Sequence, residues 1–151
     1  MLGMIGGNKD MSVALAEPKA WTFFYESYIN LNVLREVNYV PEQWGVARLA
    51  GFDIRIQPRA NLVRSDRHSV HGIFATGTHA GLDRLYAHAR NVLGETYLAD
   101  AVLAETHDGK YKPAMCHIFP AMNPRPATND YIDRIVVPPY ELRVMQRLAS
   151  E

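Results

Sequence analysis

Residues 24–34, FYESYINLNVL, join a β-forming run to a helical pattern. Upstream, the aromatic run 21–25 predicts a first strand. Downstream, residues 31–37 predict a short helix with Asn30 or Asn32 as its N-cap. A strand that passes through a polar turn into a helix leaves backbone N–H groups directed at one place. The turn therefore predicts a site for an anionic or carbonyl oxygen, and a plain capped turn is the alternative.

The chain after this turn is patterned mainly as strands. We expect strands at 44–49, 52–56, 70–76, 97–106 and 111–119. Apolar and polar residues alternate through the first two segments on either side of Gly51, which fits two half-buried strands or one bent strand. Asp108-Gly109, between the last two segments, predicts a hairpin because Asp-Gly suits a tight turn.

Helical patterns are fewer and shorter. Thr78 is the expected N-cap of the clearest helix. The apolar face of that helix is formed by Leu82, Leu85, Tyr86 and Ala89. Two further helices are expected, one at 131–136 and one that begins near Pro139. Many strands joined by few short helices predict an α+β domain, built as a small mixed or antiparallel β-barrel with flanking helices.

Length and charge limit the classes of protein. At 151 residues the chain fits one domain, which we place at 20–151 behind a flexible leader at 1–19, with Met1 or Met11 as the start. Lys plus Arg and Asp plus Glu both total 16, so the chain lacks the basic excess typical of proteins that bind nucleic acids or anionic membranes. No run reaches the ~20 apolar residues of a membrane span, and no signal peptide is recognisable, so we expect a cytoplasmic protein of undetermined oligomeric state.

The polar composition favours a small anionic ligand over a metal. Twelve of the basic residues are Arg, which binds carboxylates and phosphates through paired hydrogen bonds. His68 and His71 would face opposite sides of a strand, so we expect no metal site and no cofactor. Cys116, the only cysteine, is expected to be buried and structural rather than a reactive thiolate paired with His117.

Several motifs follow one another in the order of a known family. Residues 25–34, YESYINLNVL, are similar to YGSLMNPEVL, the opening signature of the γ-glutamylcyclotransferase-like proteins. LDRL at 82–85 resembles that family's Leu-Asp-x-Leu helix, and YIDRIV at 131–136 resembles its closing Tyr-Leu-Asp-Arg-Ile-Leu. Further matches lie at 47–56, 61–63, 70–74, 97 and 124–126. The resemblance spans residues 20–148 and keeps the same order throughout.

The resemblance implies a small mixed β-barrel with its pocket at the loop 25–30. In the family, the α-amine of a γ-glutamyl amine attacks its own γ-carbonyl, which releases an amine or amino acid and 5-oxoproline. Backbone N–H groups of the turn hold the substrate, and one Glu moves the proton. The implied substrate-binding residues are Tyr25, Ser27, Tyr28, Ile29, Asn30, Tyr97 and Tyr131. Candidates to bind a substrate carboxylate are Arg59, Asn61 and His71.

The chain departs from the family at two positions. Tyr86 stands where the family has its proton-moving Glu, and a phenol with a pKa of about 10 is a poor base near neutral pH. We therefore expect Tyr86 to orient the substrate or to donate a hydrogen bond. Glu26 replaces a Gly, so the loop is reshaped or the carboxylate enters the pocket. The catalytic candidates are Glu26 first and Glu95 second.

Three kinds of function fit these residues. The first is a divergent enzyme that cyclises a small γ-glutamyl amine or a related amide to 5-oxoproline. The second is a catalytically inactive binding module on the same fold, which senses an acidic small molecule. The third is a structural or partner-binding domain with a filled pocket. A carboxylate within hydrogen-bond distance of a ligand at the Ser27 amide would separate the first from the others.

Overall fold

The computed structural model describes residues 18–56 and 58–135. The elements in chain order are β1 (Lys19–Phe24), η1 (Glu26–Ile29), α1 (Leu31–Glu36), β2 (Trp44–Ile56), β3 (Ala60–Thr78), α2 (His79–Leu93), β4 (Leu98–Thr106), β5 (Tyr111–Ile118) and α3 (Asn129–Ile135). The predicted α+β class, with a largely antiparallel sheet and flanking helices, is confirmed.

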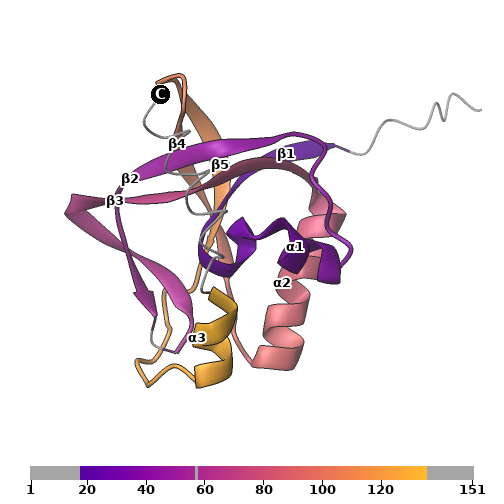
Figure 1. Ribbon diagram of the computed structural model, residues 1–151, viewed down its shortest axis with the longest axis vertical. Helices are drawn as coiled ribbons and strands as arrows, with labels where there is room; N and C mark the ends of the chain where they lie inside the picture. The colour runs from indigo at the N-terminus through magenta and orange to yellow at the C-terminus, as the bar shows by residue number, and fades with distance from the viewer. Residues whose placement is uncertain (1–17, 57, 136–151) are drawn as a thin grey trace, which may run out of the picture.

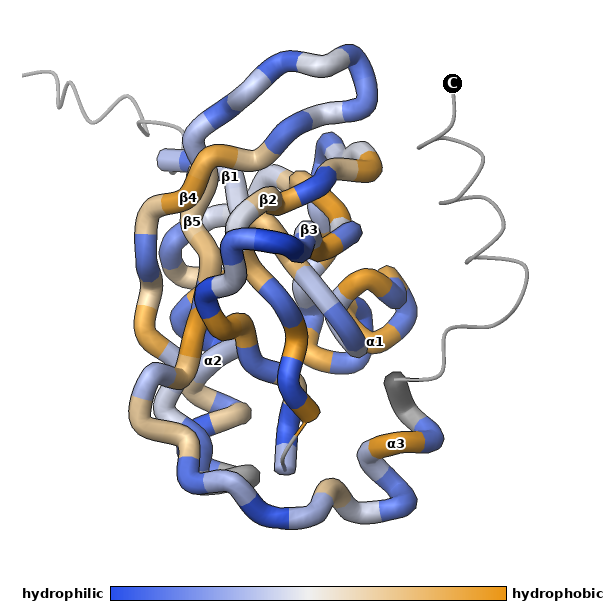
Figure 2. The backbone as a smooth tube through the Cα atoms, turned by 90° about the vertical axis from the view of Figure 1, so that its left-hand side faces the viewer, coloured by the Kyte–Doolittle hydropathy of each residue, from blue (hydrophilic) through white to orange (hydrophobic). Residues whose placement is uncertain are grey.

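The five strands form a closed ring in the order β1-β3-β2-β4-β5. Neighbours pair antiparallel, except that β5 meets β1 in parallel at Thr22 and Met115. Figure 1 shows α1 and α2 together on one side of the ring and α3 at its lower end. In Figure 2 the chain leaves β5, runs along the bottom of the molecule and reaches α3 on the opposite side. This connection brings α3 back toward η1.

β1 contributes to two hydrophobic cores because alternate residues of a strand face opposite sides of the sheet. Phe23 is fully buried inside the ring, where it belongs to the same cluster as Leu49. Phe24 faces outward and is buried between the ring and the helices, with Leu34 of α1 and Leu82 of α2. The turn at 24–34 therefore begins at a strand end that is packed on both faces.

The predicted helix starts agree with the structure. The Asn30 side chain caps α1 by accepting a hydrogen bond from the Asn32 N–H at 2.9 Å. The Thr78 hydroxyl caps α2 by accepting from the Gly81 N–H at 3.0 Å. Short polar side chains satisfy N–H groups that the first helical turn leaves unpaired. For this reason both helix starts were readable from the sequence.

The strand predictions need one clarification and one correction. Segments 44–49 and 52–56 are one bent strand, β2, whose pairing register shifts between Ala50 and Phe52. The strand expected at 70–76 is only the end of β3, which begins at Ala60. Residues 65–68 have no partners on β2 at the register shift, and they are polar and largely exposed. This bulge removes the alternation that would have revealed the first half of β3.

The predicted domain limits can be compared only in part. Lys19, which we assigned to the leader, is the first residue of β1 and pairs with Thr78. Residues 1–17 and the helix expected from Pro139 lie outside the described residues. α3 matches the short helix expected at 131–136, with its start at Asn129.

The end of β1 lies beside Gly72 of its neighbour β3 at a distance that only glycine permits. A Cβ atom on Gly72 would lie 2.2 Å from the Phe24 carbonyl oxygen and 2.7 Å from Cζ of Phe23. The first of these atoms is main chain and the second belongs to a fully buried ring, so neither can move aside. Gly72 thus sets the path by which the chain leaves β1 for the turn at 25–30.

Replacing Gly72 with Ala should destabilise the protein by about 3 kcal/mol, the upper range for overpacking a tight site. The matched control is Gly45→Ala in β2, where a Cβ meets nothing within 4 Å and the free energy of unfolding should change by less than about 0.5 kcal/mol. Urea titration of both variants measures the difference. Equal stabilities would contradict the close approach at Gly72.

Candidate functional site

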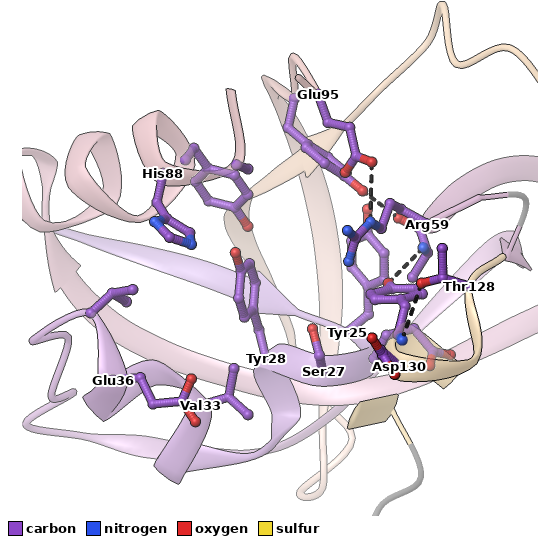
Figure 3. A pocket seen from close by; sticks show the side chains of 17 residues that line it. Tyr25, Ser27, Tyr28, Val33, Glu36, Arg59, His88, Glu95, Thr128 and Asp130 are labelled. Carbon is purple, nitrogen blue, oxygen red and sulfur yellow. Dashed lines mark hydrogen bonds and ion pairs between the residues drawn. The ribbon is translucent and has the colours of Figure 1, made fainter. Parts of the chain in front are cut away.

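A cavity of about 490 Å³ opens at the turn after β1. It collects nine of the thirteen residues proposed from the sequence, although they come from five separate parts of the chain. These nine are Tyr25, Glu26, Ser27, Tyr28, Arg59, Tyr86, Glu95, Tyr97 and Tyr131. Figure 3 shows Tyr25, Ser27 and Tyr28 in the middle of the cavity, with other labelled residues on either side of them.

The other four proposed residues do not line this cavity. Ile29 packs beside the outer hydrophobic core, and Asn30 is occupied as the cap of α1. The Asn61 side chain donates to the Phe119 carbonyl at 2.6 Å and accepts from its N–H at 2.9 Å, so it ties β3 to the end of β5. His71 is exposed on β3. All four lie in the described part of the chain, and three of them have structural contacts there.

Glu26 adopts an unusual backbone conformation at the centre of the cavity. Its φ is 54°, in the left-handed region where a side chain is disfavoured by about 1–2 kcal/mol. The turn keeps the conformation for which glycine is suited, although the chain has a carboxylate there. Tyr25, the N-cap of η1, provides no side-chain hydrogen bond to the first turn. The amides of that turn are therefore not occupied by a side-chain cap.

The Glu26 carboxyl group is half-buried in the cavity wall. Burial raises the pKa of Glu26 above its ordinary value of 4.5. Tyr25 and Tyr131 lie near enough for the Glu26 charge to raise the pKa of both phenols. No hydrogen bond or ion pair engages this carboxylate among residues 18–56 and 58–135. It is available to a ligand.

Glu95, by contrast, is already paired. It is 4% exposed, and its Oε1 accepts a hydrogen bond from Nε of Arg59 at 3.1 Å. Burial raises the pKa of Glu95, and the Arg59 charge opposes this rise. The Arg59 guanidinium also lies over the Tyr131 ring, 4.4 Å from its centroid. Arg59 is the one Lys or Arg among the described residues that line the cavity, and these two contacts fix its side chain.

Two tyrosines hold the start of β3 from opposite sides. The Tyr97 hydroxyl donates to the Ala60 carbonyl at 2.8 Å. The Ala60 N–H donates to the Tyr131 hydroxyl at 2.7 Å. Burial raises the pKa of Tyr131 to about 12, so this phenol is neutral near pH 7. Because Tyr131 accepts at its oxygen, its own proton is left for a different acceptor.

Tyr86 of α2 lines the cavity, and aromatic contacts fix its ring. Its ring stacks on His117 with centroids 3.6 Å apart and planes 11° apart, and it meets Tyr28 edge to face at 5.8 Å. Burial raises the pKa of Tyr86 well above 10, so it remains a protonated phenol. At this position the wall offers a hydrogen-bond donor and not a base.

Known structures share this arrangement of ring, helices and turn. One named gamma-glutamyl cyclotransferase aligns with a TM-score of 0.63 at 19% identity, over 87% of this chain and 86% of that one. The fold is that of gamma-glutamyl cyclotransferase. An uncharacterized protein from Homo sapiens aligns with a TM-score of 0.63 at 18% identity, over 87% of each chain. YkqA from Bacillus subtilis has the same score at 16% identity, over 93% of this chain and 58% of its own. No protein-family model and no curated protein sequence matches the chain.

Eight other lining residues of this gamma-glutamyl cyclotransferase fold were not predicted from the sequence. They are Val33, Glu36 and Val37 beside α1, His88 and Ala89 of α2, Ala60 of β3, and Thr128 and Asp130 near α3. The α1 residues recur at intervals of three and four, which places them on one helical face. This periodicity could have indicated the lining residues, but it is equally typical of residues that pack in a hydrophobic core.

Membrane-spanning helices and metal-binding clusters are both absent from the described part of the gamma-glutamyl cyclotransferase fold. None of its helices is long and apolar enough to cross a membrane. No three His, Cys, Asp or Glu residues at 18–56 and 58–135 are grouped so that they could hold a metal ion.

The buried His117 should make this fold sensitive to mild acid. Burial lowers the pKa of His117 from 6.5 to about 4, with Asp83 opposing the shift, and its Nδ1 has no partner among the described residues. As the pH falls, His117 is protonated in the unfolded chain before it is protonated in the folded protein. The free energy of unfolding is therefore highest above pH 6.5 and decreases as the pH falls toward 4. Between pH 7 and 4.5 the wild type should lose about 2 kcal/mol more than His117→Phe, which keeps the ring against Tyr86.

Urea titrations at the two pH values measure this difference. His71→Phe, at an exposed site, is the control and should behave as the wild type. If wild type and His117→Phe lost the same stability, His117 would not be the buried neutral imidazole.

Proposed function

We propose that this chain is a divergent gamma-glutamyl cyclotransferase-like enzyme that cyclises a small γ-glutamyl amine or a related amide to 5-oxoproline. The observation that carries the proposal is the unpaired Glu26 carboxylate, half-buried at the central turn of the cavity with the Arg59 cation in the same cavity. A carboxylate and a fixed cation are complementary to the α-ammonium and α-carboxylate of a glutamyl group.

The reaction requires protons to move between two nitrogens. The α-ammonium gives up a proton, and the free amine forms a bond to the γ-carbonyl carbon. The carbonyl oxygen then carries negative charge until the bond to the leaving nitrogen breaks. The attacking nitrogen loses its second proton as the lactam forms, and the leaving nitrogen takes up two protons in all, so the products are 5-oxoproline and the protonated amine. The protein must supply a proton carrier and donors for the oxygen.

Glu26 is the proposed proton carrier. Burial raises its pKa toward the working pH, which favours a group that accepts a proton and returns it in the same reaction. Glu26 belongs to the loop that the resemblance assigns to substrate, and its backbone is in the left-handed region. Such strain is typical of functional sites.

Arg59 is the proposed partner of the substrate's α-carboxylate. Its Nε is taken by Glu95 and its face by Tyr131, so its orientation is fixed before a ligand arrives. A preorganised guanidinium loses less freedom on binding. Glu95 then acts as a positioning residue that holds Arg59, and not as a second proton carrier.

Neutral phenols are the proposed donors to the developing oxyanion. Tyr86 and Tyr131 both line the cavity, and the pKa of each is raised by burial, so both keep their protons near neutral pH. The first turn of η1, at Ser27, has no side-chain cap and adds backbone amides in the same cavity. Donors fixed before the reaction stabilise a transition-state charge more than mobile water does.

A ligand-binding protein without catalysis is the alternative, and one observation favours it. Tyr86 stands where the family has its proton-moving Glu, and its raised pKa excludes it as a base near pH 7. If Glu26 does not reach the substrate amine, the cavity would bind a γ-glutamyl compound and leave it unchanged.

Mass spectrometry of 5-oxoproline formed from a panel of γ-glutamyl amines tests the proposal. Glu26→Gln should lower kcat by about 100-fold or more, the usual contribution of a proton carrier. Glu95→Gln should chiefly raise KM, by about tenfold, because Arg59 loses one charged hydrogen bond. Glu42→Gln, at an exposed carboxylate outside the cavity, is the control and should leave both constants unchanged.

A second variant separates loss of the carboxylate from loss of the fold. Glu26→Gly relieves the strained φ, so its stability should stay within about 1 kcal/mol of wild type while its activity falls as in Glu26→Gln. Full activity in both variants would contradict the role of Glu26. Binding of γ-glutamyl amines with no 5-oxoproline from wild type would favour the binding protein.

A further inference from the structure

The cavity extends in two directions from the central turn. On one side of Ser27 and Tyr28, Figure 3 shows Arg59, Glu95, Thr128 and Asp130, which we call the polar arm. On the other side lies a space between the two helices, which we call the α1–α2 arm. The α1–α2 arm is lined by Val33, Glu36, Val37, His88 and Ala89.

The walls of the α1–α2 arm are mainly apolar. Val33 and Val37 are half-buried and four residues apart, which places both on the same side of α1. Ala89 is 3% exposed on α2, three residues after Tyr86, and its small side chain leaves room there. Glu36 and His88 are exposed, and Figure 3 shows them at the outer side of this arm. The arm therefore has apolar inner walls and a polar outer end that faces solvent.

The proposed reaction leaves this arm without an occupant. The α-carboxylate of the glutamyl group is assigned to Arg59 in the polar arm, and the α-ammonium to Glu26 at the turn. The γ-carbonyl then lies at the turn as well. The remaining part of the substrate, beyond the scissile amide, extends away from the polar arm.

We propose that the α1–α2 arm binds the leaving amine and selects amines with an unbranched aliphatic chain. This inference rests on the proposed function and adds to it the class of amine. Apolar walls favour methylene groups, each of which binds more tightly when it is removed from water. Open access at His88 allows a chain of several carbons.

Charge argues for an amine over an amino acid as the leaving group. A leaving amino acid carries a carboxylate beside the attacking centre, and this group needs a cation or several donors when it is desolvated. The described residues of the α1–α2 arm include no Lys or Arg. An uncharged alkyl chain meets no such penalty.

A homologous series tests the inference. γ-Glutamyl n-alkylamides from methyl to hexyl are incubated with the full chain, next to γ-glutamylglycine, and 5-oxoproline is measured by mass spectrometry. kcat/KM should rise about threefold to fourfold with each methylene until the arm is full. γ-Glutamylglycine should be a poorer substrate than the propylamide.

Two variants connect this gain to the arm. Ala89→Leu fills the arm, so the ratio of kcat/KM for the hexylamide to that for the methylamide should fall to about one. Val33→Ser, at a half-buried position that tolerates a polar side chain, should reduce the gain for each methylene. Val63→Ser, a matched change at a half-buried valine of β3 outside the cavity, should leave the gain unchanged.

The outcomes separate this inference from the function on which it rests. Turnover that does not depend on chain length, or that prefers γ-glutamylglycine, would overturn the inference and leave the proposed function in place. If no amide is turned over but calorimetry shows affinity that grows with chain length and is lost in Ala89→Leu, the reaction is refuted and the alkyl site stands. Absence of both turnover and binding would overturn both.

Discussion

The contact on which the molecule depends is the close approach of the end of β1 to Gly72 of the neighbouring strand β3. The missing side chain there lets the Phe24 carbonyl and the Phe23 ring lie against β3, so the strand is packed on both faces up to its last residue. A chain held this firmly can enter a tight turn at Tyr25 without fraying. The cavity is built around that turn, so a steric property of one glycine positions the proposed chemistry.

Most of the fold was readable from the sequence because its signals are local. Asn30 and Thr78 cap helices within a few residues of their own positions, and Asp108-Gly109 closes a hairpin between adjacent strands. The first half of β3 was not readable. A polar bulge at 65–68 interrupts its pairing, and an exposed bulge has no reason to keep the alternation of a half-buried strand.

The site was less predictable than the fold because its pairs are distant in sequence. Glu95 meets Arg59 across 36 residues, and the stacking of Tyr86 on His117 depends on how α2 lies against β5. Nine proposed residues share one cavity, but the sequence did not distinguish a free carboxylate from a paired one. Burial and pairing decide that difference, and both are products of tertiary packing.

The ring is joined unequally around its circumference. β5 meets β1 through the pair Thr22 and Met115, and β2 meets β4 only at Ala47 and Arg48, whereas the remaining strand pairs run the length of their elements. The ring can thus be regarded as two plates, β1-β3-β2 and β4-β5, hinged along two narrow seams. Thermal opening takes least energy where fewest hydrogen bonds must break. The two plates should therefore separate first along these seams, and the cavity, whose described lining includes Ala60 of β3 but no residue of β4 or β5, keeps its strand wall on one plate.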